Sequence, residues 1–334
     1  SIKAKEMTPD SSTDALQIGI LVMAYGTPSS PENIPEYYTH IRRGRPPTDE
    51  QLQDLISRYA AIGGISPLRE RTQAQLDAVE AALKVLAGDS AHPDCFLVQL
   101  GQKHAAPFIE DGVAALVEAG AQRIVGLVLA PHYSGFSVGQ YHARASSAAE
   151  EFGVPFVGLD SWSLNEGYLT HQANSVREQL QGLPTNTHVF FTAHSLPERV
   201  LLDDPYPEQL LASAEAIAER AGLASSNQAS SNQASSNRTW SIGWQSAGRT
   251  PEPWRGPDIL DCIKEVAANS SAEGVLVVPQ GFTADHLEVL FDLDIEAADL
   301  AAQLGLAFAR TEVVNADSAV MAALASLLFN LAEI

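Results

Sequence analysis

The sequence predicts an α/β protein with two domains built on parallel sheets. Short runs rich in β-branched and aromatic residues alternate with helical stretches along the whole chain. Most of these runs are continuously apolar, which is typical of parallel strands that helices cover on both faces. With 334 residues, the chain is also long enough to bury two cores of ordinary size.

Seven strands are expected, and several of them end in a polar or glycine-containing turn. Examples are Tyr25-Gly26-Thr27, His194-Ser195 and Gln280-Gly281. Ligands of open α/β sheets bind at the carboxyl ends of the strands, so we expect the functional residues there. The expected strands cover residues 18–24, 95–100, 124–130, 154–158, 188–193, 240–244 and 275–279.

The stretch 160–184 separates two similar α/β halves. We expect an N-terminal domain over residues 15–172 and a C-terminal domain over residues 173–312. A last helix, within residues 313–334, is expected to pack back on the first domain. Residues 225–237 form the tandem repeat SSNQASSNQASSN, which is too polar for a core and predicts a flexible surface loop.

The composition excludes several kinds of partner and location. A formal net charge of −21 repels phosphate backbones, so no nucleic acid partner is expected. No apolar run is long enough for a transmembrane segment, and residues 1–17 lack the apolar core of a signal peptide. We therefore expect a cytoplasmic protein. The absence of a long coiled coil or an extended apolar face favours a monomer.

Common cofactor motifs of α/β proteins are missing. The chain contains neither a Gly-x-Gly-x-x-Gly turn nor a Gly-Lys-Ser/Thr phosphate loop, which disfavours dinucleotide and nucleoside triphosphate enzymes. Its two cysteines, Cys95 and Cys262, fit neither a disulfide framework nor a four-thiolate cluster. Both are expected to be buried.

Candidate chemical groups follow strands in the second half. One strand leads directly into His194, where a hydrogen-bonding cap is the simplest interpretation. The segment GFTADHLEVLFDLDIE places Glu288, Asp292 and Glu296 at spacings of four along one helical face. That face is either solvated or, because apolar residues surround Glu288, directed in part into a cleft. An imidazole with carboxylates is a plausible site for a divalent metal.

Six motifs, in order along the chain, resemble those of the ferrochelatase family. They are YAAIGGISPL (59–68), LGQKHAAPFIED (100–111), LAPHYSGFSVGQY (129–141), TAHSLP (192–197), WQSAGRTPEPWRGPDI (244–259) and GFTADHLEVLFDLDIE (281–296). The resemblance extends from about residue 18 to the final helix. It implies two doubly wound, chelatase-like domains, each with a four-stranded parallel sheet, and a porphyrin cleft between them.

The resemblance also assigns roles to individual residues. The family's iron-site histidine falls on His194 and its partner glutamate on Glu288, which makes these two the catalytic and metal-binding candidates. Asp292 and Glu296 continue an acidic path for metal or protons, and Tyr25 is the expected axial residue to product iron. Porphyrin-binding positions fall on Tyr25, Arg42, Arg58, Tyr59, Ser66 and Tyr141. Without the resemblance, most of these positions would be interpreted as a polar helix edge or a packing aromatic.

By resemblance, the chain inserts ferrous iron into a porphyrin, with iron as substrate. We expect coproporphyrin III, because Arg42, Arg43 and Arg45 suit a substrate with four propionates, and the tyrosine of MAYGTP belongs to that branch of the family. The simpler alternative is that these arginines only cap the end of a helix at Gly44, where the helix dipole favours basic residues. Some relatives carry a [2Fe–2S] cluster on C-terminal cysteines, which this chain lacks, so no cofactor is expected.

Three alternatives stay open. The substrate can instead be protoporphyrin IX, or the chain can be a related chelatase that loads cobalt or nickel into another tetrapyrrole. The length and the arginine segment disfavour the latter. A porphyrin or haem carrier would need the cleft but not His194 together with Glu288. Besides the two substrates, transient contacts with neighbouring haem-pathway enzymes are expected.

Overall fold

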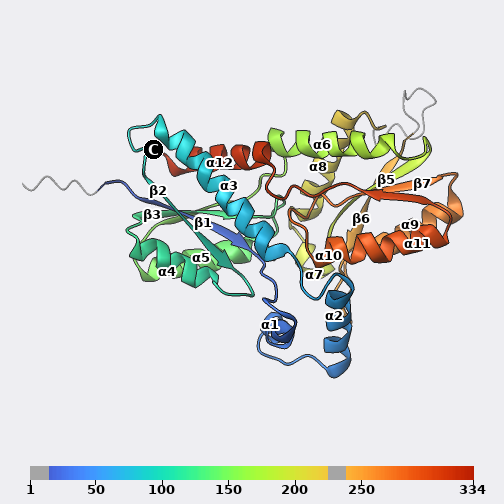
Figure 1. The fold of residues 1–334 in the computed structure, drawn as a ribbon, viewed down its shortest axis with the longest axis horizontal. Coiled ribbons are helices and arrows are strands. Elements are labelled where there is room, and N and C mark those ends of the chain that lie inside the picture. Colours follow the sequence, from blue (N-terminus) through green and yellow to red (C-terminus); the bar gives the residue numbers. More distant parts are fainter. Residues whose placement is uncertain (1–14, 225–237) are drawn as a thin grey trace, which may run out of the picture.

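The computed structural model describes residues 15–224 and 238–334, and it contains two four-stranded sheets (Figure 1). The repeat over residues 225–237 lies outside the described residues. Neighbouring strands are parallel in both sheets, with the orders β2-β1-β3-β4 and β6-β5-β7-β8. The strands are β1 (Ile18–Ala24), β2 (Phe96–Gln102), β3 (Arg123–Val128), β4 (Phe156–Leu159), β5 (Thr187–His194), β6 (Trp240–Gln245), β7 (Gly274–Val278) and β8 (Ala307–Arg310).

Helices cover both faces of each sheet, as the continuously apolar strands predict. They are α1 (Ile34–Ile41), α2 (Asp49–Ala61), α3 (Leu68–Gly88), α4 (Ile109–Glu118), α5 (Val138–Glu151), α6 (Glu166–Gln181), α7 (Glu198–Leu201), α8 (Tyr206–Ala221), α9 (Ile259–Asn269), α10 (Leu287–Leu290), α11 (Ala298–Gln303) and α12 (Ser318–Ala332), with the 3-10 turn η1 (Pro31–Asn33) and the π-helix η2 (Asp292–Ala297). On the first sheet, α3 and α12 pack on one face and α4 and α5 on the other. On the second, α6 and α8 oppose α9, η2 and α11.

One hydrophobic core extends across both sheets. It includes Val22 of β1 and Phe191 of β5, with Tyr168 of α6 and Leu324 of α12 in the same cluster. The Tyr168 hydroxyl also donates to the carbonyl of Gln280, 2.6 Å away, beyond the end of β7. The domain boundary expected between residues 172 and 173 falls inside α6, which helps to build this shared core.

The two sheets repeat one topology. Each begins with a central strand, places the second strand on one side, and places the third and fourth on the other. The strand order therefore reverses between β1 and β3, and again between β5 and β7, and ligands bind at such switch points in open α/β sheets. Tyr25 directly follows β1, and His194 is the last residue of β5.

Two elements differ from the sequence expectations. Strand β8 was not among the expected strands; it is a four-residue edge strand whose residues are all half-buried. The segment 281–296 does not form one regular α-helix, because α10 is followed by η2 and then α11. In η2 the Glu296 amide donates to the carbonyl of Phe291, 2.9 Å away, which is the i→i+5 spacing of a π-helix.

Candidate active site

The sequence-predicted residues of both halves meet near the two switch points. Arg58 of α2, in the first half, forms an ion pair with Asp292 of η2, in the second, with 3.9 Å between Nη1 and Oδ1. The charge of Glu288 also contributes to the raised pKa of Tyr25, which follows β1. In Figure 1, α2 projects below the two sheets, and one of its ends lies next to α10. The site is thus assembled from segments far apart in the sequence.

The ring of His194 has a fixed orientation. Its Nδ1 lies 2.5 Å from the carbonyl oxygen of Ser195, and the Tyr206 hydroxyl donates to the His194 carbonyl at 3.0 Å. A carbonyl can only accept, so Nδ1 carries the hydrogen in the neutral ring and Nε2 keeps its lone pair. Nε2 lies 3.8 Å from Oε1 of Glu288, and 41% of the histidine side chain is exposed. This nitrogen can accept a proton or a metal ion.

Glu288 also pairs with a second histidine. Its Oε2 contacts Nε2 of His286, whose Nδ1 lies 3.1 Å from the carbonyl of Ala284. Burial alone would raise the pKa of Glu288, but His286, His194 and Arg58 together lower it to about 2. Burial likewise opposes protonation of His286, but the adjacent carboxylate outweighs it and raises the pKa of this imidazole. Glu288 is therefore ionised at neutral pH between two imidazoles.

Asp292 differs from Glu288, because its pKa is raised and not lowered. It is only 7% exposed, so a solvated acidic face is the wrong interpretation for this residue. Burial and the charge of Glu288 raise its pKa to about 7, although Arg58 and a 3.0 Å hydrogen bond from the Ser246 hydroxyl act in the other direction. Burial also raises the pKa of the half-buried Glu296. Neighbouring carboxyls with separated pKa values are a frequent arrangement in acid–base catalysis.

The predicted porphyrin-binding residues near α2 have protein partners of their own. The Arg58 guanidinium lies 5.3 Å from the Phe291 ring centroid and forms an ion pair with Asp54 of its own helix. Tyr59 and Ser66 are buried, and the Ser66 hydroxyl accepts a 3.0 Å hydrogen bond from the Leu68 amide at the start of α3. Their contact with a porphyrin stays a prediction.

Tyr25 and Tyr141 belong to a cluster of aromatic and basic side chains. Tyr25 is 43% exposed, and burial together with the charge of Glu288 raises its pKa. Its ring centroid lies 4.6 Å from that of His104, whose Nδ1 is 2.9 Å from Nδ1 of His40. Tyr141 is buried beneath Lys103, whose Nζ lies 5.2 Å from the ring centroid. Burial lowers the pKa of this lysine to about 8.

The arginine segment after α1 contains both a helix cap and an unused donor. The Gly44 amide donates to the carbonyl of Thr39, and Nε of Arg45 lies 3.4 Å from the carbonyl of Arg42, as a cap predicts. Nε of Arg42 is buried and has no hydrogen-bond partner within the described part of the chain. A buried donor without a partner is costly. Contact of Arg42 with a propionate stays a prediction.

Several of these groups were not singled out from the sequence. His286 was noted only as a neighbour of Glu288, and Lys103 and His104 only as letters of the motif LGQKHAAPFIED. Their positions after strands were the available signal, because β2 ends at Gln102. Which of them faces the site depends on the side-chain orientations in the folded chain.

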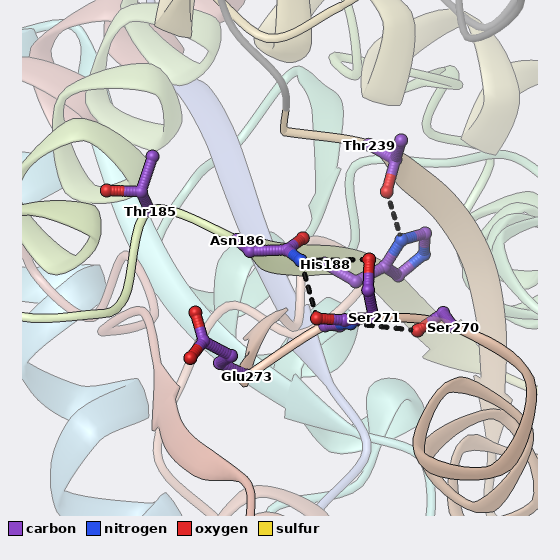
Figure 2. A pocket seen from close by; sticks show the side chains of 8 residues that line it. Thr185, Asn186, His188, Thr239, Ser270, Ser271 and Glu273 are labelled. Carbon is purple, nitrogen blue, oxygen red and sulfur yellow. Dashed lines mark hydrogen bonds between the residues drawn. The ribbon is translucent and has the colours of Figure 1, made fainter.

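Figure 2 shows a pocket of about 520 Å³ at the opposite edge of the second sheet, where β5, β6 and β7 begin. There the Asn186 amide donates to the carbonyl of Ser271, and the nitrogens of His188 lie 2.6 and 2.7 Å from the hydroxyls of Thr239 and Ser241. These polar groups satisfy one another, so we place the site elsewhere.

Within residues 15–224 and 238–334, no three His, Cys, Asp or Glu side chains are grouped closely enough to hold a metal ion. His194 and Glu288 are thus a pair of possible ligands for a metal substrate. Over the same residues, no helix has the length and apolar character needed to cross a membrane.

Comparison with known proteins identifies the family. The ferrochelatase family model matches residues 17–331. The chain belongs to the ferrochelatase family. It is 41% identical over 314 residues to the coproporphyrin III ferrochelatase of Geobacillus kaustophilus, covering 92% of this chain and 94% of that protein. It is also 41% identical over 316 residues to the coproporphyrin III ferrochelatase of Bacillus subtilis, covering 93% and 96% of the two chains.

Solved structures agree with the ferrochelatase fold. SirB from Bacillus subtilis, solved with Fe3+, is 12% identical and aligns with a TM-score of 0.54 over 95% of this chain and 96% of its own. A cobalt complex of the sirohydrochlorin chelatase SirB from the subspecies spizizenii gives 0.51, at the same identity and coverage. The predicted fold class, two chelatase-like parallel sheets, is confirmed.

Proposed function

We propose that this ferrochelatase inserts ferrous iron into coproporphyrin III and releases two protons. The observation that carries the proposal is the pair formed by His194 and Glu288, with 3.8 Å between Nε2 and Oε1. The family match and the names of the two relatives support the same reaction. Both side chains are partly exposed, so a substrate can reach them.

Metallation requires that two pyrrole protons leave as iron enters the ring. Nε2 of His194 has the free lone pair needed to accept a pyrrole proton, because Nδ1 is committed to the Ser195 carbonyl. Glu288, ionised between two imidazoles, attracts the ferrous ion and then stabilises an imidazolium. Asp292, with a pKa of about 7, can pass a proton onward at neutral pH.

Substrate choice is proposed to depend on the segment after α1. Coproporphyrin III carries four propionates, and arginine binds carboxylates by charge-assisted and often bidentate hydrogen bonds. Arg42 and Arg43 lie next to each other, and the charge of Arg43 contributes to the lowered pKa of Lys103 beside Tyr141. Cations from two segments thus lie on the side of the site where Tyr25 is found.

No resident cofactor is proposed. The two cysteines of the chain are buried separately, Cys95 just before β2 and Cys262 in α9. This placement supports the expectation that no [2Fe–2S] cluster is held.

Comparing catalytic efficiency on coproporphyrin III and protoporphyrin IX tests the substrate assignment. We expect a preference for coproporphyrin III of at least about tenfold, equivalent to about 1.4 kcal/mol. Arg42→Ala and Arg45→Ala should reduce this preference, whereas Arg177→Ala on the distant helix α6 should not. Equal or better turnover of protoporphyrin IX in dilute detergent would refute the coproporphyrin assignment.

A further inference from the structure

Two carboxylates, Asp285 and Asp294, flank His286, Glu288 and Asp292 along the chain. Asp285 directly precedes His286, and Asp294 lies inside η2, two residues after Asp292. Between them the chain changes from the short helix α10 to a π-helix, a wide turn that is rare in proteins and frequent at functional sites. A contact that joins the two ends of this irregular segment would fix their relative positions.

Arg310 contacts both of these carboxylates. Its Nε and Nη2 donate to the two oxygens of Asp294 at 2.6 and 2.9 Å, a bidentate arrangement. The same Nη2 lies 3.9 Å from Oδ1 of Asp285. The arginine side chain is only 16% exposed, so water screens these contacts less than it would on an open surface. One guanidinium thereby joins the start of the segment to η2.

Arg310 is anchored in the second sheet through its backbone. It is the last residue of β8 and pairs in register with Val277 of the buried strand β7. Its own Nη1 donates to the carbonyl of Thr311 at 3.2 Å. The guanidinium is therefore held in a defined position relative to the second sheet, which also carries His194 at the end of β5.

The Asp285 end is tied to the first half as well. Asn315 donates to Asp285 Oδ2 and accepts from the Asp285 amide, both at 3.0 Å. Gln75 of α3, which is fully buried, donates to the carbonyls of Asn315 and Thr283 at 3.0 and 2.9 Å. Asp285 is thus held in place by contacts that extend to α3, and Arg310 connects Asp285 to η2.

We propose that Arg310 is a positioning residue, which holds His286, Glu288 and Asp292 in the geometry used for iron insertion by clamping Asp285 and Asp294. The proposal rests on the proposed function. Misplacement of a catalytic group by about 1 Å can cost about 100-fold in rate, so a clamp of this kind acts on turnover. It does not act on porphyrin affinity, because Arg310 contacts no residue predicted to bind the porphyrin.

Two substitutions of Arg310 distinguish the role of its planar, two-donor guanidinium fork from the role of its positive charge. Arg310→Gln should lower kcat about tenfold or more, with the KM for porphyrin changed less than about threefold. Arg310→Lys keeps the charge but not the planar fork, so it should recover only part of kcat. Asp294→Asn breaks one of the two contacts of Arg310, so it should lower kcat in the same direction but no more than Arg310→Gln, which breaks both. The double variant should be no slower than Arg310→Gln, because the Asp294 contact is already lost there. Arg220→Gln, which breaks another bidentate pair, with Glu166 on α6, is the matched control.

Amide hydrogen exchange gives a readout that does not depend on activity. In Arg310→Gln, peptides over residues 284–297 should exchange faster than in the wild type, while peptides of β5 and β7 stay protected. Unchanged exchange and unchanged kcat would overturn the proposal, as would a rise in the porphyrin KM at constant kcat. A wild type that fails to insert iron would refute the proposed function, and the exchange data would still decide whether Arg310 clamps the segment.

Discussion

The chemistry of the site depends on which side chains carry protons near neutral pH. Glu288 is ionised, with a pKa of about 2, while Asp292 keeps its proton up to a pKa of about 7. His194 presents a lone pair on Nε2 because Nδ1 donates to a carbonyl. Thus β5 supplies a proton acceptor, α10 supplies an anionic site for a cation, and η2 supplies a proton donor.

The first prediction concerns His194. His194→Ala should lower kcat for iron insertion at least about 100-fold, because removing a general base usually costs that much. Porphyrin affinity, measured by fluorescence quenching, should stay within a few-fold, because the imidazole acts at the centre of the ring. Substantial residual turnover at saturating iron would remove His194 from the mechanism.

The second prediction concerns the pH dependence of stability. The pKa of Asp292 is raised from 3.8 to about 7, so between these values the folded state binds a proton that the unfolded state has lost. The free energy of unfolding of the wild type therefore falls as the pH rises through this window. Asp292→Asn removes this term, so its stability relative to the wild type should increase from pH 4 to pH 8, by up to about 4 kcal/mol.

Urea titrations of both proteins at several pH values measure this difference. Glu296→Gln, whose parent carboxyl is less buried, is the control and should show a smaller pH-dependent change. A constant difference between Asp292→Asn and the wild type, or one that decreases with pH, would show that Asp292 is ionised in the folded protein.

Single residues differed in how well the sequence predicted them. His194 ends β5 and Glu288 lies in α10, the helix that follows β7. Their places near strand ends marked them as candidates, and the resemblance of TAHSLP and GFTADHLEVLFDLDIE to ferrochelatase motifs assigned them to the metal site. The contact of His286 with Glu288 was not predictable, because it depends on the extended backbone of His286 at the N-cap of α10. The ion pair of Arg58 with Asp292 joins two halves of the fold and has no local signal.

At the scale of elements, the turn after β7 lies tightly against the end of β5. A Cβ added to Gly281 would lie 2.6 Å from Cβ and 2.9 Å from Cα of Ala193, the residue before His194. Real Cβ atoms do not approach so closely, so one of the two backbones would have to move. Glycine at this position therefore permits the approach of the strand end that carries His194 to the segment that carries Glu288.

The third prediction follows from this contact. Gly281→Ala should destabilise the protein by about 1–3 kcal/mol through overpacking, and it should lower kcat because the His194–Glu288 distance changes. Gly88→Ala, at the end of α3, is the control, since its Cβ would meet nothing within 4 Å. Wild-type stability and turnover in Gly281→Ala would show that the turn has room to shift.

Long apolar elements were predictable and short or irregular ones were not. Strand β1 was predicted with its observed bounds because all seven of its residues are buried and apolar. Strand β8 has four half-buried residues, too few to show a periodic pattern. The π-helix could not be predicted, because a spacing of four between acidic residues fits both a regular helix and the wider turn.

At the scale of the whole molecule, the shared core connects the two sheets. The cluster that contains Val22 of β1 also contains Leu276 of β7, with side chains of α6 and α12 among them. Hydrogen bonds from Tyr168 to the Gln280 carbonyl and from Thr283 to the Leu129 carbonyl add polar links, at 2.6 and 2.7 Å. The halves are therefore expected to depend on each other for stability.

The fourth prediction is a single cooperative unfolding transition. Trp162 belongs to the shared core and precedes α6, and Trp244 lies in β6 of the second sheet. Variants that retain only one of these tryptophans should show the same urea midpoint by fluorescence, and both should match circular dichroism. Two separated midpoints would show that the halves unfold independently.

Anaerobic incubation of the protein with ferrous iron and coproporphyrin III shows most directly whether the site inserts iron. The absorption change that accompanies metallation is followed against a protein-free reaction and against His194→Ala. We expect many turnovers per protein in the wild type and a rate near the protein-free value in the variant. Porphyrin binding without any acceleration of metallation would contradict this expectation and would identify a carrier instead of an enzyme.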